Sequence, residues 1–475
     1  MSTKGRRMEA ASSGPFSMLM HLAGDPTQID IFSADSCIEG WLATERALAI
    51  AQGELGIITV EDSRAIAAAA TIDIVDRDEL WKSSKNVGYP ILGLVRQISA
   101  QLPAGPDGRV HYGATTQDIM DSALALQLSR SMTALDAQLE QFGDALAVLA
   151  QEHASTVMPG RTHAQQAVPT TFGATLSTLL GQLTRHRTRL AEARPRVAMI
   201  SMFGAGGTSA AYGPQSVAVR HRVAELLELH DTDTPWHVER DGLAEFGWLC
   251  ATIAGACAKL ARNVVDLSRT EIGEVFEPYS SHRGASSTMP QKVNPISSEA
   301  IIGLSGTAAA LASTLPRIQE AGHERSAGEW QIEWHVIPQL AVLAGSALSE
   351  AIVIAEGMRV DADRMRENLD LDGGLVMAEA HMIHLADAMG REHAHDLVYE
   401  AAARARSTRR VLADTLPEVA REAGKESLLP EKLTTADDYL GEAVGIVSNA
   451  VRTWQQLPVT RPTLTRIDDL AQVTS

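Results

Sequence analysis

Apolar residues recur at three- and four-residue spacing over several long segments of the chain. In 119–154 and 170–197 this spacing is kept for many turns, which predicts two long amphipathic helices. Two further segments, 243–267 and 336–358, are apolar nearly all round, and a helix of that kind must be buried on every side. Because one monomer could bury only one or two such helices, the pattern predicts a central bundle that is shared between subunits.

Interruptions of the helical pattern divide the chain into four parts. Residues 1–25 contain Ser, Gly and charged residues with little periodicity and are expected to form a flexible tail. Short helical patterns over 26–110 predict an N-terminal helical domain, which contains the loop "PAGPDG" at 103–108 near its end. The long helices occupy 111–364, and shorter, more charged helices over 365–475 predict a small C-terminal helical domain. No strand-rich region or solenoid repeat is visible, so the expected fold class is all-α.

The composition agrees with this picture and excludes several classes of protein. Of the 475 residues, 45% are hydrophobic and only 4% aromatic, which favours closely packed helices over a β-sandwich. The net charge of −18 would repel nucleic acid but allows a small anionic substrate at a locally positive site. With three cysteines, no signal segment and no uninterrupted apolar run long enough to span a bilayer, we expect a cytoplasmic protein without a membrane partner.

The sequence also lacks the common cofactor signatures. It contains no P-loop, dinucleotide fingerprint, HExxH or Cys/His cluster, so we expect neither a metal nor a cofactor. Any chemistry must then come from the loops between the long helices. Four stretches interrupt the helical pattern with polar side chains, and each also has a plain structural interpretation.

The first stretch is "HYGATTQDIMD", 111–121, in which Thr115, Thr116 and Gln117 lead into a helix. Two hydroxyls and an amide at a helix N-terminus suit a carboxylate ligand, because the unpaired backbone N–H groups and the helix dipole attract an anion. The alternative is that Thr115 or Thr116 simply caps the helix, and this stretch taken alone favours the cap.

The second stretch, "MPGRTHAQQAVPTTFG" at 158–173, is expected to be a loop ahead of a long helix that begins near residue 169. Its polar side chains suit a carboxylate clamp or an acid–base group, with a structural role for the histidine as an equal alternative. These side chains are Arg161, Thr162, His163 and Gln165.

The third stretch is "GASSTMPQKVNP", 284–295. Asn294 suits a helix N-cap and Pro295 the first helical position, so this stretch predicts the start of a helix. That interpretation explains neither Ser286-Ser287 nor Lys292. A serine oxygen can act as a base if a lysine, a helix dipole and backbone donors stabilise its alkoxide, and the small residues before it would let the loop move.

The fourth stretch, "HERSAGEWQIEWH" at 323–335, concentrates charges and two tryptophans in an apolar region. Glu324 and Arg325 either pair with each other or face a site, and a structural ion pair is at least as well supported.

Taken together, these stretches resemble the three separated conserved regions of the fumarase/aspartase superfamily, the last of which has the form GSSxMPxKxNP. The match here is "ASSTMPQKVNP", with Ala285 where the family usually has Gly. The flanking sequences "PWHVERDGLAEF" and "LDLDGGLVMAEA" look like the 3-carboxy-cis,cis-muconate cycloisomerase branch. The resemblance implies a three-domain all-α fold and a homotetramer with a twenty-helix core. Each active site would take one conserved region from each of three subunits.

The resemblance also implies roles for individual residues. Ser286 matches the serine proposed as the base, and Ser287 would support the loop and an oxyanion. Lys292 and Asn294 match ligands of a substrate carboxylate. The two remaining regions would contribute the acid–base candidate His163 and further substrate-binding residues. These are Thr115, Thr116, Gln117, Arg161, Thr162, Gln165 and, from the fourth stretch, Arg325.

One departure bears on the substrate. Many members of the cycloisomerase branch have His-Lys-Arg after the Met-Pro of the loop, whereas this chain has Gln291-Lys292-Val293. With fewer basic side chains, a small dicarboxylate fits better than a tricarboxylate. The leading hypothesis is therefore a cofactor-independent lyase that removes a proton next to a carboxylate and passes through an aci-carboxylate. It would eliminate a nitrogen substituent, such as nitrite from nitrosuccinate, to give fumarate.

Two alternatives stay open. One is 3-carboxy-cis,cis-muconate cycloisomerase, which closes a lactone by an addition of the reverse type. The other, more remote, is a non-catalytic helical protein of the lens-crystallin kind.

Overall fold

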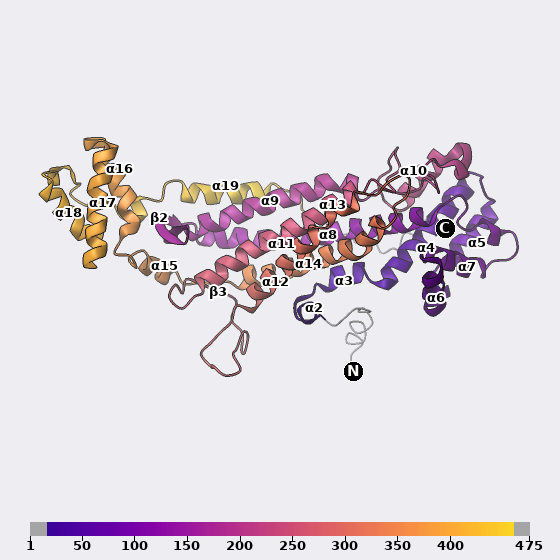
Figure 1. Cartoon of the computed structure of the whole chain (residues 1–475), viewed down its shortest axis with the longest axis horizontal. Coiled ribbons are helices and arrows are strands. Elements are labelled where there is room, and N and C mark those ends of the chain that lie inside the picture. The colour runs from indigo at the N-terminus through magenta and orange to yellow at the C-terminus, as the bar shows by residue number, and fades with distance from the viewer. Residues whose placement is uncertain (1–16, 460–475) are drawn as a thin grey trace.

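The computed structural model describes residues 17–459, and helices make up nearly all of the regular secondary structure in this range (Figure 1). Long helices lie side by side along the middle of an elongated molecule, with groups of shorter helices at its two ends (Figure 1). The predicted all-α fold class is therefore confirmed. Most of the predicted tail, 1–25, lies outside the described residues, and its described end contains the short helix α2 (Met18–Ala23).

The central bundle is formed by the segments with the strongest helical pattern. Buried Leu, Ile and Ala side chains from all of these helices form one continuous hydrophobic core. One helix begins earlier than predicted, so that the tryptophan-containing stretch after residue 328 forms its first turns. The bundle helices are α8 (Thr116–Glu152), α9 (Phe172–Val197), α11 (Asp241–Leu267), α12 (Ile296–Ala312), the short α13 (Leu315–Ile318) and α14 (Glu329–Gly357).

A last helix, α19 (Ala443–Gln455), returns from the C-terminal end and packs on α8 and α9 (Figure 1). Trp454 of α19 is buried against Gly143 of α8, where an added Cβ would lie 2.1 Å from the indole ring. The indole Nε1–H donates to Asp144 Oδ1 at 2.7 Å. The absence of a side chain at residue 143 is thus what allows α19 to join the bundle.

The range predicted as one C-terminal domain, 365–475, is consequently divided in the structure. Three of its helices surround a small core of their own at one end of the molecule, whereas α19 and Met365 of α15 (Ala362–Asn368) belong to the bundle core. These three helices are α16 (Ala378–Met389), α17 (Arg391–Thr408) and α18 (Leu412–Glu422).

The N-terminal helices lie at the opposite end and pack around the first turns of α8, whose Ile119 and Ala123 are part of their core. They are α4 (Ala34–Glu54), α5 (Val60–Ala69), α6 (Arg77–Val87) and α7 (Ile91–Ser99), joined by α10 (Ser216–Leu226), whereas the preceding α3 (Pro26–Ile31) packs beside the bundle on α8 and α14. The described chain also has two short antiparallel pairs, β1 (Val157–Thr162) with β2 (Gln165–Thr171) and β3 (Val275–Phe276) with β4 (Arg359–Val360).

We expected no apolar segment long enough to span a bilayer, and three helical stretches among the described residues show that this expectation is wrong. By length and composition alone, the helical stretches 241–267, 296–318 and 329–357 could each cross a membrane. In the structure the first and third have 67% of their most apolar stretch buried inside the bundle, whereas the second has 28%. The apolar character of α11 and α14 is thus largely accounted for by bundle packing, and that of α12 is not.

Candidate active site

The first candidate stretch lies at the start of α8. Thr115 is the N-cap, and its backbone N–H donates to Asp118 Oδ2 at 3.1 Å in a capping box. The capping role suggested for Thr115 is therefore confirmed. Thr116 is the first residue of the helix, and both threonines are only partly buried at this helix end.

Gln117 is fully buried, and its amide is held by hydrogen bonds on both sides. Its Nε2 donates to Asp121 Oδ2 at 3.0 Å and to the carbonyl of His237 at 2.8 Å. Its Oε1 accepts from Arg325 Nη1 at 2.5 Å, and Arg325 Nη2 donates to the carbonyl of Ala205 at 2.8 Å. The first and fourth stretches therefore meet, and Gln117 holds Arg325 at the start of α8.

A buried charged cluster, which the sequence did not lead us to predict, lies next to Gln117 in the first turns of α8. Asp118 accepts from His237 Nε2 at 2.8 Å and from the backbone N–H of Gly204 at 2.9 Å. Asp121 pairs with the guanidinium of Arg240, which also binds Glu333, and all three side chains are buried. Two acidic residues three apart on the buried side of an apolar helix were a signal for such a cluster, because buried charges require partners.

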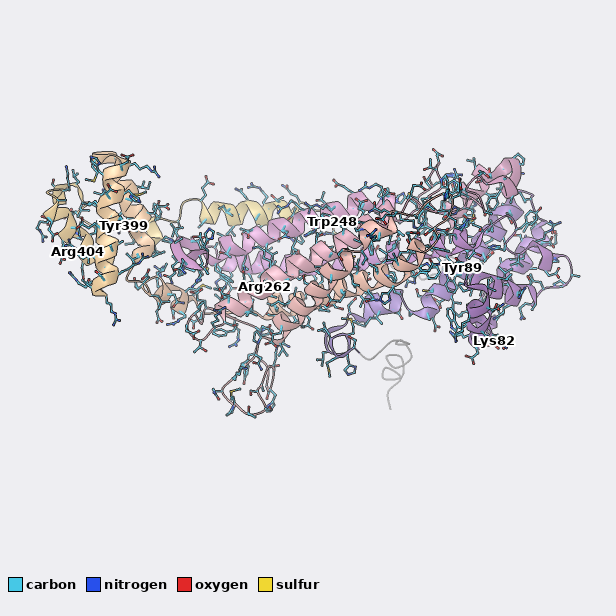
Figure 2. All side chains as sticks on the ribbon, viewed as in Figure 1. Lys82, Tyr89, Trp248, Arg262, Tyr399 and Arg404 are labelled. Atoms are coloured by element: carbon cyan, nitrogen blue, oxygen red, sulfur yellow. The ribbon has the colours of Figure 1, made fainter. Side chains whose placement is uncertain are left out.

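An aromatic group adjoins this cluster. Tyr89 stacks on Trp330 with ring centroids 5.4 Å apart, and Trp334 lies edge-on to Trp330 at 5.0 Å. Figure 2 shows Tyr89 where the N-terminal helices meet the bundle. Burial raises the pKa of the neighbouring Glu333 carboxyl to about 7, although the charge of Arg240 lowers it. The start of α8 thus combines cationic, polar and aromatic side chains.

The second candidate stretch differs from its prediction. Residues 158–173 were expected to be a loop before a helix starting near 169, but 158–171 belong to the β1–β2 hairpin and α9 begins at Phe172. The turn is made by His163 and Ala164, both with positive φ, so the residues of one strand can return along the other. Thr162, His163 and Gln165 are all exposed at this tip.

Arg161 of the hairpin has a different role from the one predicted. Its Nη1 lies 2.9 Å from Glu274 Oε2 and its Nη2 lies 2.5 Å from Oε1, in a bidentate pair with a fully buried carboxylate. Asn368 Nδ2 donates to the same carboxylate at 2.7 Å. Arg161 therefore anchors the hairpin to the segment before β3, and its fork does not face outward as a substrate clamp would.

The third stretch forms an exposed loop that projects from the bundle between β3 and α12 (Figure 1). The Oγ atom of Ser286 accepts from the backbone N–H groups of Thr288 at 3.3 Å and Met289 at 3.1 Å. Two backbone donors on one hydroxyl oxygen stabilise negative charge there, as a serine base requires. Ser287 and Lys292 are exposed on the same loop.

The base of the loop corrects the cap assignment. Asn294 is not the N-cap of α12: its backbone N–H and its Nδ2 both donate to the carbonyl of Gly284, at 2.8 and 3.0 Å, and Pro295 holds the N-cap position. Gly284 has a φ of 69°, and a Cβ there would lie 2.3 Å from the Asn294 carbonyl oxygen. Asn294 therefore closes the loop at its base, and Gly284 is the residue that permits this closure.

The N-terminus of α12 already carries an anion from its own chain. The buried Glu277 carboxylate accepts from the backbone N–H groups of Ser297 at 3.2 Å and Ser298 at 2.7 Å, and from Arg283 Nη2 at 3.3 Å. These N–H groups are therefore occupied by a carboxylate of the same chain and do not face a substrate carboxylate. Their partial positive charge stabilises the base of the Ser286 loop.

Within one chain, the three regions do not come together. The α8 helix separates the Thr115–Gln117 region from the hairpin, and its 37 residues correspond to roughly 55 Å at the usual rise of an α-helix. The Ser286 loop projects away from the bundle near β3, at the hairpin end of the molecule (Figure 1). A hydrogen bond between Gln117 and Arg325 does join two of the candidate stretches, the first and the fourth.

Comparisons with known proteins account for nearly the whole chain. Residues 29–309 match a family described as lyase, and 374–450 match the adenylosuccinate lyase C-terminus. The 3-carboxy-cis,cis-muconate cycloisomerase of Pseudomonas aeruginosa is 42% identical over 427 residues, which cover 89% of this chain and 93% of that protein. Trans-aconitate decarboxylase 1 of Mycosarcoma maydis is 36% identical, over 89% of this chain and 86% of its own.

A solved structure agrees with these sequence matches. The 3-carboxy-cis,cis-muconate lactonizing enzyme from Pseudomonas putida superimposes with a TM-score of 0.84 at 39% identity, covering 92% of this chain and 99% of its own. The relatives are named enzymes, and the three polar regions at 111–121, 158–173 and 284–295 all lie within the first matched length, 29–309. The chain is thus an enzyme of the lyase class that belongs to the fumarase/aspartase superfamily, in the branch of the 3-carboxy-cis,cis-muconate cycloisomerases.

Proposed function

We propose that the protein catalyses a reversible addition or elimination at the carbon next to a carboxylate of a small polycarboxylic acid, with Ser286 as the base. The observation that carries the proposal is the position of Ser286 Oγ, which accepts two backbone N–H groups on an exposed loop. Those donors lower the cost of the alkoxide that must take the proton. The same oxygen returns a proton to carbon when the reaction runs as an addition.

Among such reactions, the relatives favour lactonisation over the nitrogen elimination that the loop sequence suggested. Two of the similar proteins reported above are named for the 3-carboxy-cis,cis-muconate reaction. In that reaction a carboxylate oxygen adds to a carbon–carbon double bond, and the aci-carboxylate formed next to it takes up a proton. Arg325 at the start of α8 is a candidate ligand for one of the substrate's carboxylates.

Elimination from a substituted succinate remains the second candidate, and a specific observation favours it. Gln291 and Val293 flank Lys292 on the exposed loop, so the neighbours of this lysine offer no second cation for a third carboxylate. A dicarboxylate such as nitrosuccinate would not need one. This candidate would release nitrite and fumarate after Ser286 removes the proton.

We also propose that the active enzyme is a homotetramer in which three chains contribute to each site. Two observations support this. The candidate regions lie at opposite ends of α8, and only 28% of the most apolar stretch of 296–318 is buried within the chain. Trp248 on α11 is likewise 49% exposed on the surface of the bundle (Figure 2). Close packing of these faces between chains would bury them and bring the regions together.

A single panel of substrates tests the reaction. Purified protein is incubated with 3-carboxy-cis,cis-muconate, nitrosuccinate, aspartate, argininosuccinate and adenylosuccinate, while lactone and fumarate are followed by proton NMR. Lactone from the first compound alone would establish the cycloisomerase. Fumarate and nitrite from nitrosuccinate would establish the elimination, and no product from any compound would overturn both candidates.

A further inference from the structure

The Gln117 amide has only one orientation that its surroundings accept. Its nitrogen faces Asp121 Oδ2 at 3.0 Å and the His237 carbonyl at 2.8 Å, and both of these atoms are acceptors. Its oxygen faces Arg325, which offers only donors. Turning the amide over would place oxygen against two oxygens and nitrogen against a guanidinium. The partners therefore fix the carbonyl oxygen toward Arg325.

Asp121, in turn, is fixed by a saturated guanidinium. Arg240 Nη1 donates to Asp121 Oδ2 at 2.8 Å and to the Trp236 carbonyl at 3.0 Å, while Nη2 reaches Asp121 Oδ1 at 3.1 Å. Arg240 Nε donates to Glu333 Oε2 at 3.0 Å, and Nη2 also donates to Glu333 Oε1. These bonds use all five guanidinium N–H groups of a buried side chain, so the fork cannot rotate without losing several of them.

We propose that the buried Arg240–Asp121 pair, acting through Gln117, positions Arg325 to bind a substrate carboxylate. The inference rests on the proposed function, because it takes the start of α8 as part of the active site. Arg325 is partly exposed, and its bonds to Gln117 and Ala205 occupy two of its five N–H groups. The others are available for a planar carboxylate, the partner that a guanidinium fork fits best.

The substitution Asp121→Asn tests the chain of contacts at its most sensitive point. An asparagine must place its NH2 group either at the Oδ1 position, against the donor Arg240 Nη2, or at the Oδ2 position, against the donors Arg240 Nη1 and Gln117 Nε2. Either placement removes a charge-assisted bond to Arg240, so residue 121 no longer fixes the Gln117 amide that holds Arg325. We expect KM to rise about 10- to 100-fold, the size of a lost hydrogen bond to a charged group, while kcat stays within about threefold.

A double-mutant cycle separates positioning from general damage to the fold. If Asp121 acts through Arg325, then Asp121→Asn costs nothing further in an Arg325→Ala protein, and the two KM effects do not add. The exchange variant with Asp121→Asn and Gln117→Glu again places an acceptor opposite Arg325 and keeps the original net charge. It should recover part of the lost affinity.

Asp136→Asn is the matched control, because Asp136 also pairs with a buried arginine, Arg187, at 2.9 Å but lies on the middle turns of α8. Its KM effect, if any, should add to that of Arg325→Ala. Helix content by circular dichroism and the melting temperature identify variants that fail to fold. If Asp121→Asn fails to fold, Gln117→Met takes its place in the cycle. Methionine is similar in size to glutamine but lacks the oxygen that accepts from Arg325.

Two results would overturn the inference while leaving the proposed function intact. One is that the wild-type enzyme turns over a substrate, but the effects of Asp121→Asn and Arg325→Ala on KM add fully in the double variant. The other is a normal KM in Asp121→Asn. If the wild type turns over nothing, the proposed function fails. Crystal structures of wild type and Asp121→Asn then decide the positioning separately, by whether Arg325 stays bonded to residue 117.

Discussion

The Glu277 carboxylate binds Ser298 twice, accepting from its backbone N–H and from its hydroxyl, each at 2.7 Å. Because Glu277 lies just before the Ser286 loop and Ser298 just after it, this contact closes the loop across its base. Replacing Glu277 by Gln removes the charge that faces the helix end. We expect a loss of about 1–3 kcal/mol in the free energy of unfolding. Chemical denaturation followed by circular dichroism measures it.

Glu299→Gln provides the control for this prediction. Glu299 is an exposed acidic residue in the same first turn of α12, so its loss should change the free energy of unfolding by less than about 1 kcal/mol. Equal effects of the two substitutions would show that the Glu277 contacts contribute nothing specific.

Ser286→Ala removes the proposed base. We expect kcat to fall about 100-fold or more while KM changes little, because the hydroxyl acts on the proton and does not bind a carboxylate. Steady-state kinetics with whichever substrate of the panel is turned over provides the measurement. Thr288→Ala is the matched variant, since it keeps the backbone N–H that Ser286 accepts. An active Ser286→Ala enzyme would remove the base assignment without affecting the fold.

Gly143→Ala should weaken the packing of α19. The added Cβ cannot fit 2.1 Å from the Trp454 ring, so α19 must shift or the indole must leave its site. We expect the free energy of unfolding to fall by about 1–3 kcal/mol, as for other overpacked cores. In α19 itself, Gly445→Ala meets no atom within 4 Å and should leave stability unchanged or raise it by up to about 1 kcal/mol. Similar losses for both variants would argue against the packing explanation.

The His111–Glu45 pair predicts a dependence of stability on pH. Burial by itself lowers the pKa of His111, but the charge of Glu45 and its hydrogen bond, 2.6 Å from Nδ1, outweigh burial and raise it. The raised pKa means that the stability from this pair is fully present below pH about 6.5, the ordinary value in the unfolded chain. It is lost as the pH rises through the higher value of the folded state.

The stability difference between wild type and His111→Gln should therefore be largest near pH 6 and shrink toward pH 9. Urea unfolding at a series of pH values measures this difference. A gap that stays constant over the whole range would show that the histidine contributes by packing rather than by charge.

The sequence predicted the long helices well because their information is local. Apolar spacing placed α9 and α11 within about three residues of their observed starts, since each helix has its buried face in its own residues. The same spacing could not show that residues 158–171 pair as strands. A two-stranded hairpin at the end of a bundle has no apolar face long enough to leave a repeating pattern.

Partners of polar side chains were much harder to predict, because they lie far away in the sequence. Arg161 and its partner Glu274 are 113 residues apart, and Arg240 and Asp121 are 119 apart. From sequence, Arg161 could equally face a substrate or a buried carboxylate. Only the folded chain distinguishes an arginine that anchors a hairpin from one, like Arg325, that keeps donors available at a helix end.

The length of α8 has a genetic consequence under the proposed assembly. In the proposed tetramer the two ends of α8 would belong to different active sites. In a mixed tetramer, a chain that has lost Arg325 and a chain that has lost Ser286 would therefore inactivate different sites. In some sites of the mixture, every contributing region would come from a chain that is intact in that region. Two alleles that are each inactive alone would then restore part of the activity when expressed in the same cell.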